Sequence, residues 1–161
     1  NYFRGVKTSR AGTIVVVAGG NTMLSDGVKV SREVFVLGYP KSVGIRAVEQ
    51  VDFRTPLVRR GIVAGKNRHL GSIILDCQVD GGNSGGPVIQ IAHDERGKER
   101  FCVIGLVTEF VPAAEEWVNR NHGQVKVNFS NSGYSVVVPM DFVWEMIELD
   151  RLSLTQRGFR R

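Results

Sequence analysis

Short runs of β-branched and aromatic residues recur along most of the chain. Gly, Pro, Asn, Asp or charged residues separate them, which is the pattern of strands joined by turns. We expect strands at 34–37, 57–64, 72–75, 88–91, 101–110 and 134–138. The polar stretch 94–98 contains a glycine between two apolar runs, so it predicts a hairpin with antiparallel strands. This spacing predicts an all-β protein, either a sandwich or a closed barrel, because closure removes exposed strand edges.

Two segments carry helix signals. Residues 113–118 follow Pro112 and have acidic residues in the first turn, both favourable at a helix N-terminus, so we expect a short surface helix there. A second helix is expected from Asp141 to about Arg151, with Asp141 as its N-cap and an apolar face packed on the barrel. Beyond it, residues 152–161 lose this periodicity and are expected to fray.

Composition narrows the class of protein. The chain has 161 residues, of which 42% are hydrophobic and 23% charged, as expected for one globular domain with a real core. Its longest apolar runs, such as 13–18, are far shorter than the roughly 18–20 residues of a membrane-spanning helix, so no membrane association is expected. The chain begins with Asn1 and has no apolar leader, so we expect it to be processed or cut.

Charge and cysteine content add little to this picture. The 21 Lys and Arg residues outnumber the 16 Asp and Glu residues, for a net charge of +5. Basic residues gather between Arg54 and Arg68, but no aromatic residues are interleaved with them, so nucleic-acid binding is not expected. Cys77 and Cys102 lie in apolar runs and are read as two buried thiols or as one bridge. The histidines and cysteines lack metal-ligand spacing, so neither a metal nor a cofactor is expected, and no compartment is indicated.

The segment 80–88 carries the strongest chemical signal. Glycine occupies positions 81, 82, 85 and 86 around a single serine, Ser84. Such a density favours a sharply folded loop with positive φ angles, in which backbone N–H groups converge while one hydroxyl projects. Acyl transfer needs that pairing of a nucleophile with donors for an oxyanion. An ordinary glycine-rich turn is the alternative, whereas a phosphate-binding loop is disfavoured because no Lys-Ser or Lys-Thr pair follows the glycines.

The motif Gly82-Asn83-Ser84-Gly85-Gly86-Pro87 closely resembles the nucleophile motif of trypsin-like (chymotrypsin-fold) serine peptidases. The Asn before the serine is similar to that of bacterial high-temperature-requirement-type proteases. Segments 34–40, 60–64, 103–108 and 133–139 resemble successive strands of the same family. The resemblance implies an antiparallel six-stranded Greek-key barrel, the second barrel of the chymotrypsin fold, with a C-terminal α-helix.

The resemblance also implies a division of the chain and a set of site residues. Residues 1–30 would be a remnant of an N-terminal barrel or a linker, 31–151 the barrel with its helix, and 152–161 a basic tail. Ser84 would be the nucleophile, and the backbone N–H groups of Gly82 and Ser84 would form the oxyanion hole. The residues that the resemblance places along the polypeptide substrate are Gln78, Val79, Thr108, Glu109 and Phe110. No Asp at Gln78 or Val79 selects a basic side chain, so a small or apolar one is expected, although Asp80 leaves the basic alternative open.

A serine needs a general base, which a third group usually orients. In the family the order is His, Asp, Ser, and the first two come from an N-terminal barrel. His69 is the only histidine before Ser84, and it lies in a polar turn of the second barrel, so we expect it to be an exposed turn residue. The strand-like run 12–17 has Thr13 or Gly12 where the family's Asp would stand. The chain alone is therefore expected to be inactive.

Three functions follow from these observations. The first is a trypsin-like serine endopeptidase of which this chain is the C-terminal part, with the missing N-terminal barrel upstream of Asn1. The second is a pseudoprotease that binds peptides by strand addition along residues 108–110. The third is a non-proteolytic β domain that binds acidic partners through the basic cluster at 54–68. If a first barrel is missing, the second should expose an apolar patch where the first would pack.

Overall fold

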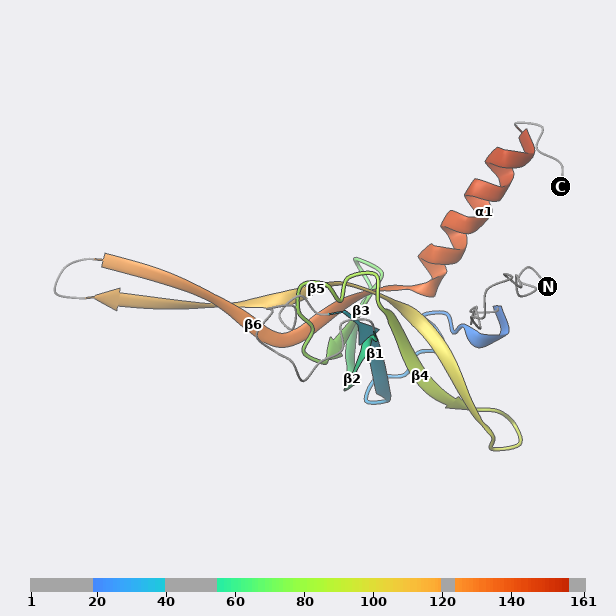
Figure 1. Ribbon diagram of the computed structural model, residues 1–161, viewed down its shortest axis with the longest axis horizontal. Coiled ribbons are helices and arrows are strands. Elements are labelled where there is room, and N and C mark those ends of the chain that lie inside the picture. The colour runs from blue at the N-terminus through green and yellow to red at the C-terminus, as the bar shows by residue number, and fades with distance from the viewer. Residues whose placement is uncertain (1–18, 40–54, 120–123, 157–161) are drawn as a thin grey trace.

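The structure is a computed structural model, and it describes residues 19–39, 55–119 and 124–156 (Figure 1). The strand expected at 12–17 lies outside these residues. The elements in chain order are the 3-10 helix η1 (Gly19–Asn21), strands β1 (Glu33–Gly38), β2 (Leu57–Asn67), β3 (Ser72–Asp76), β4 (Pro87–His93), β5 (Glu99–Asn119) and β6 (Gln124–Pro139), and helix α1 (Met140–Gln156).

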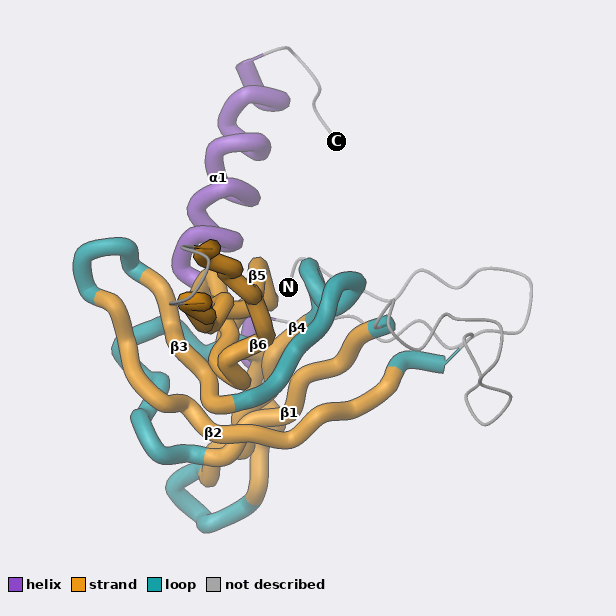
Figure 2. Tube along the Cα trace, turned by 90° about the vertical axis from the view of Figure 1, so that its left-hand side faces the viewer, coloured by secondary structure: helices purple, strands orange, loops and turns teal. Residues whose placement is uncertain are grey.

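The six strands close into one antiparallel barrel in the order β1-β2-β3-β6-β5-β4, with β4 pairing back to β1 (Figure 2). The expected fold class, an antiparallel six-stranded barrel with a C-terminal helix, is confirmed. The hairpin expected at 94–98 is also confirmed. There the Asp94 N–H donates to the Lys98 carbonyl at 2.9 Å, and Gly97 takes a φ of 76°.

The barrel is filled by side chains at alternating strand positions. Along β1, Val34 and Val36 are fully buried, whereas Phe35 and Leu37 on the other face are half-buried. This is the period of two that a strand with one face on a core requires. The fully buried core is mostly β-branched and consists of Val28, Val34, Val36, Val63, Ile73, Leu75, Val79, Val88, Ile104, Val107 and Val137.

The segment before β1 packs against the barrel. The Met23 N–H donates to the Val103 carbonyl at 2.9 Å, and the Val28 side chain is 2% exposed within the core. The Lys66 Nζ donates to the Ser25 carbonyl at 2.6 Å and ties this segment to the end of β2. Residues 22–28 therefore contribute to the body of the barrel.

Beyond the barrel, β5 and β6 continue as a two-stranded arm (Figure 1). Residues 112–119 of β5 pair in antiparallel register with residues 124–131 of β6. The surface helix expected at 113–118 is therefore wrong. The signals that follow Pro112 are local, and they are outweighed by cross-strand pairing with the alternating β-branched and aromatic residues of β6.

Helix α1 is anchored to the barrel by its first turns. The Asp141 carboxylate accepts hydrogen bonds from the Ser25 N–H at 2.8 Å and from the Ser25 hydroxyl at 3.0 Å. The Trp144 Nε1–H donates to the Thr22 hydroxyl at 3.3 Å. These contacts fix the start of α1 against the segment before β1. The expected N-cap role of Asp141 is therefore wrong, because Asp141 lies inside the first turn and its carboxylate binds Ser25.

The rest of α1 departs from the expected packing. Met146 and Leu149 are 71% and 60% exposed, and Figure 1 shows the helix leaving the barrel, so the apolar face expected to lie on the barrel does so only near its start. The helix also continues past Arg151 to Gln156, where fraying was expected. Neither Gly nor Pro interrupts residues 152–156, so nothing in that stretch breaks the helix.

Most of the exposed large apolar side chains of the described chain lie on three parts of it. On the arm they are Trp117, Val118, Val125, Val127 and Phe129, on the barrel wall Val58, Ile62 and Phe101, and on α1 Phe142, Met146, Ile147, Leu149 and Leu152. Such surface is typical of sites that contact another protein part. The expected apolar patch for a first barrel stays a prediction.

Both cysteines are buried and free, so the first of the two readings of Cys77 and Cys102 is correct. Burial raises the pKa of the Cys77 thiol above its ordinary value of 9.0, and the nearby Arg59 guanidinium opposes that rise. Within the described residues, neither helix combines the length and apolar character that a membrane span requires.

Candidate functional site

The loop at residues 80–87, called the Ser84 loop below, consists of two successive β-turns. In the first turn the Asn83 N–H donates to the Asp80 carbonyl at 3.1 Å. In the second turn the Gly86 N–H donates to the Asn83 carbonyl at 2.9 Å. Asn83 is thus the last residue of one turn and the first of the next, and its side chain is only 1% exposed.

Glycine is required at the third position of each turn. Gly82 has a φ of 98° and Gly85 a φ of 79°, in the region that type II turns need at this position and that other residues rarely adopt. Ser84 is the second residue of the second turn, so its side chain stands at a corner and is exposed. The expected tight loop with positive φ angles and one projecting hydroxyl is present.

This geometry leaves several amide groups of the loop without a partner, among them those of Gly82 and Ser84. The N–H groups of Gly82 and Ser84 donate no hydrogen bond to another residue of the described chain. Residues at the two central positions of a turn do not take part in the turn's own hydrogen bond. The Gly85 N–H, in contrast, donates to the Val107 carbonyl at 2.8 Å.

The Ser84 loop is attached to β5. The Val107 N–H donates to the Gly86 carbonyl at 3.0 Å, and the Ser84 hydroxyl donates to the Thr108 carbonyl at 2.7 Å. The register of β5 and β6 slips between Val107 and Glu109, so Thr108 lies at a bulge. Thr108, Glu109 and Phe110 are all exposed immediately beside Ser84 in this strand.

The described histidines do not serve Ser84. His69 lies exposed in the turn between β2 and β3, where its N–H donates to the Asn67 side chain at 3.1 Å. His93 ends β4 at the 94–98 hairpin and is also exposed. Within the described part of the chain, no imidazole is hydrogen-bonded to the Ser84 hydroxyl. His122 lies outside the described residues.

The other side of the Ser84 loop rests on the end of β1. A Cβ atom placed on Gly86 would lie 2.2 Å from the Leu37 carbonyl oxygen, so the backbones touch at this point. A hollow of about 380 Å³ opens here, lined by Leu37, Gly38, Tyr39, Pro56, Gly82, Ser84, Gly85, Gly86 and Pro87. The exposed serine hydroxyl and the unpaired Gly82 N–H therefore border the same hollow.

A larger hollow of about 670 Å³ lies elsewhere, over the turn between β2 and β3. His69 and Tyr134 line it together with residues 64–68, but it does not include Ser84. We place the candidate site at the smaller hollow because, of these two hollows in the described part of the chain, it is the one where an exposed serine hydroxyl lies beside unpaired N–H groups. Within the described residues, no cluster of His, Cys, Asp and Glu could hold a metal ion.

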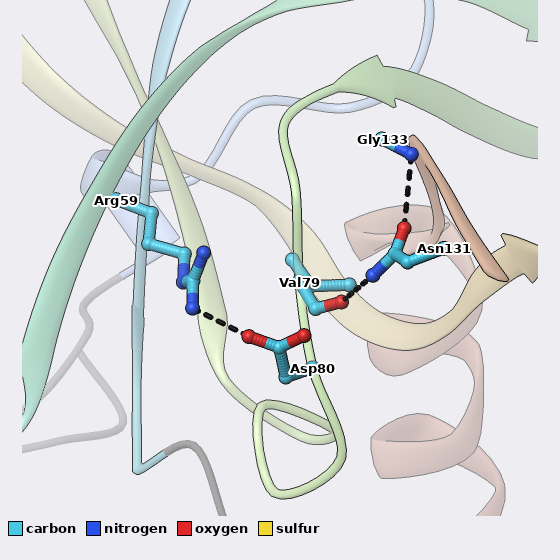
Figure 3. Close-up of polar contacts among 5 residues, drawn as sticks. All are labelled: Arg59, Val79, Asp80, Asn131 and Gly133. Atoms are coloured by element: carbon cyan, nitrogen blue, oxygen red, sulfur yellow. Dashed lines mark hydrogen bonds and ion pairs between the residues drawn. The ribbon is translucent and has the colours of Figure 1, made fainter. Parts of the chain in front are cut away.

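The residues before the loop are held by β6 (Figure 3). Gln78 is exposed, whereas the Val79 side chain is 1% exposed and belongs to the core. The Asn131 side chain donates through Nδ2 to the Val79 carbonyl at 2.6 Å and accepts from the Gly133 N–H at 2.9 Å. Val79 can therefore face a substrate only through its backbone.

An ion pair meets the same segment from the opposite side (Figure 3). The Arg59 Nη2 donates to the Asp80 Oδ2 at 2.6 Å, and both side chains are about three-quarters buried, with 28% and 24% exposed. Sequence analysis identified neither Arg59 nor Asn131 as part of the site. Side chains of a strand alternate between its two faces, so the sequence of β2 would have placed Arg59 on the same face as the buried Val63. No sequence signal pairs Asn131 with Val79.

Comparisons with known proteins give limited results. No family model matches the chain, and no curated protein matches it. A solved structure described as the HtrA-type protease AlgW with a decapeptide is similar to it, with a TM-score of 0.47 and 22% sequence identity. The match covers 86% of this chain and 33% of the other, so this chain spans about a third of that protein's length.

Proposed function

We propose that this chain carries the nucleophile half of a trypsin-like serine endopeptidase. The observation that supports this most directly is the exposed Ser84 at the corner of a double turn, beside two amide groups without partners. Ser84 attacks the carbonyl carbon of a peptide bond, and the N–H groups of Gly82 and Ser84 stabilise the oxyanion that develops on the carbonyl oxygen. Each such donor contributes about 10²–10³ in rate.

The polypeptide substrate lies along β5 in this proposal. Thr108, Glu109 and Phe110 are exposed and lead directly away from Ser84, as strand addition of an extended peptide requires. Gln78 and the Val79 backbone lie before the loop and form the floor beneath the substrate side chain. The Asp80 carboxylate is already paired with Arg59, which favours a small or apolar side chain over a basic one.

The general base and its orienting acid come from outside residues 1–161. The Ser84 hydroxyl donates to a backbone carbonyl, which can hold its direction but cannot take its proton at neutral pH. A histidine and an acid supplied by an N-terminal barrel of the same protein would replace that contact from the side of the 380 Å³ hollow. Residues 1–161 alone are therefore inactive.

A serine-directed fluorophosphonate probe tests this proposal. Residues 1–161 should show no labelling above that of Ser84→Ala, because none of the residues that the structure describes offers the hydroxyl a base. The complete encoded protein should be labelled at Ser84, and Ser84→Ala should abolish both labelling and peptide hydrolysis. Labelling of residues 1–161 at Ser84 would contradict the need for an external base, and an unlabelled complete protein would contradict the peptidase.

A pseudoprotease that binds peptides is the second candidate. It is favoured by the bond between the Ser84 hydroxyl and the Thr108 carbonyl, which engages the hydroxyl without an imidazole. In that case the complete protein binds an extended peptide along residues 108–110 with equal affinity in the wild type and in Ser84→Ala, and it hydrolyses no peptide. Fluorescence anisotropy with a labelled peptide, measured beside the hydrolysis assay, separates the two candidates.

A further inference from the structure

We infer that Arg59 and Asn131 are positioning residues that hold the Val79–Asp80 dipeptide from opposite sides and so set the direction of the Gly82 and Ser84 amides. The inference deepens the proposed function and rests on it, because it assigns a role in building the oxyanion site. Neither residue touches the reacting atoms in this arrangement. Both act on the two residues that lead into the first turn of the Ser84 loop (Figure 3).

The dipeptide fastens the start of the loop to the barrel, whereas the bonds to β5 hold its later residues, Ser84 to Gly86. After the dipeptide, the chain enters two turns with a glycine at the third position of each, and glycine restricts the backbone least. The Asn83 N–H closes the first turn on the Asp80 carbonyl at 3.1 Å. A rotation of the Asp80 peptide therefore passes directly to Gly82 and Ser84.

The Arg59–Asp80 pair differs from the pair beside it on β2. Arg59 and Asp80 are 28% and 24% exposed, whereas the next arginine, Arg60, and its partner Glu33 are 76% and 37% exposed. Partly buried charges are screened less by water, so Arg59 restrains Asp80 more strongly than Arg60 restrains Glu33. Arg59 is anchored in the barrel wall, and through Asp80 it fixes one side of the loop's first residue.

Asn131 uses both ends of its side-chain amide. Its Nδ2 donates to the Val79 carbonyl at 2.6 Å, and its Oδ1 accepts from the Gly133 N–H at 2.9 Å. The Gly133 carbonyl accepts from the Cys77 N–H at 3.1 Å. The root of the arm is thus joined to the backbone at Cys77 and at Val79, on both sides of Gln78.

This fastening matters because an oxyanion hole works only when its donors are aligned before the reaction. A displacement of about 1 Å can cost about 10²-fold in rate without loss of the nucleophile. Most of the proposed substrate contact lies along residues 108–110 of β5, which neither Arg59 nor Asn131 holds, so loss of the fastening should lower kcat much more than it changes KM.

The activity test compares matched variants of the complete encoded protein. Arg59→Met should lower kcat about ten- to hundredfold with KM changed less than about twofold, and Arg59→Lys should recover part of the loss. Arg60→Met is the control, because it removes the neighbouring exposed pair on the same strand.

Asn131→Asp has the same shape but lacks the Nδ2 donor to Val79 and should lower kcat similarly. Asn128→Asp, on an exposed part of the same strand, should not. Equal kcat values in Arg59→Met and Arg60→Met, and in Asn131→Asp and Asn128→Asp, would overturn the inference.

A second measurement separates this inference from the proposed function. Amide hydrogen exchange of residues 80–86 reports how firmly the loop is held, whether or not the protein is a peptidase. Exchange should be at least about tenfold faster in Arg59→Met and Asn131→Asp than in the wild type, and unchanged in both controls. If exchange is faster in the two variants but the probe does not label the wild-type protein, the peptidase is rejected and the fastening is kept. If exchange in the two variants equals that of the wild type and the probe labels the wild-type protein, the fastening is rejected and the peptidase is kept.

Discussion

Replacing Gly86 with alanine places a methyl group where the Ser84 loop crosses the end of β1. The new Cβ would lie 2.2 Å from the Leu37 carbonyl oxygen and 2.8 Å from the Asn83 carbonyl oxygen, against 3.4–4 Å for ordinary contact. Both neighbours are backbone atoms, so no side chain can turn aside to make room. The loop, β1 or both must move by about 1 Å.

The cost of that movement follows from the contacts it disturbs. Overpacking by one methyl group costs about 1–3 kcal/mol, and each hydrogen bond weakened adds about 1 kcal/mol. Gly86 donates to the Asn83 carbonyl and accepts from the Val107 N–H, and both bonds are strained by the shift. We expect the free energy of unfolding to fall by about 3 kcal/mol in Gly86→Ala.

Urea denaturation followed by tryptophan fluorescence measures this loss. With an m-value of about 2 kcal/mol/M, 3 kcal/mol lowers the midpoint by about 1.5 M. Gly81→Ala is the matched control in the same loop, because its Cβ would meet nothing within 4 Å and its φ is not positive. Gly81→Ala should leave stability unchanged or raise it by up to about 1 kcal/mol. If Gly86→Ala denatured at the same urea concentration as Gly81→Ala, the contact between the loop and β1 would be refuted.

Two further predictions concern the core and the buried thiol. Ile104→Ala should lower the free energy of unfolding by about 2–5 kcal/mol, because the Ile104 side chain is 0% exposed. Phe129→Ala on the arm, where Phe129 is 70% exposed, should change it by less than about 0.5 kcal/mol. Equal losses in urea denaturation would contradict the core assignment. The Cys77 thiol should react with Ellman's reagent far more slowly in the folded chain than in urea, because burial raises its pKa and excludes the reagent. Since that pKa is higher in the folded chain than in the unfolded one, the thiol's contribution to stability is present below about pH 9 and is lost as the pH rises through the folded-state value. Rapid labelling in the absence of urea would contradict the buried position.

The barrel strands could be predicted from local sequence because each alternates or is continuously β-branched and ends at a turn residue. The 94–98 hairpin and the tight Ser84 loop were predictable for a similar reason, since glycine at positive φ is a local requirement. The segment after Pro112 was not. Its acidic and alanine residues suit a helix, and only the presence of β6 beside it makes a strand the better state.

Helix α1 also has one feature that local sequence predicts and one that depends on neighbouring elements. Its presence after Pro139 was predicted from local composition, although it begins at Met140, one residue before the expected Asp141. An amphipathic face does not say what covers it, and most of the expected contact with the barrel is absent in the described chain. Sequence periodicity indicates that an apolar face exists. Whether a neighbouring element covers it depends on where the connecting backbone directs the helix.

By itself the sequence determined which loop carries the hydroxyl, because a glycine-rich turn around one serine is encoded within a few consecutive residues. Only the tertiary structure decided which residues support that loop: the Thr108 carbonyl that accepts the hydroxyl's hydrogen bond, the Arg59 that meets Asp80, and the Asn131 that meets Val79. These partners lie 24, 21 and 52 residues away along the chain. Contacts at such separations depend on strand order and register in the closed barrel, which local propensities do not specify.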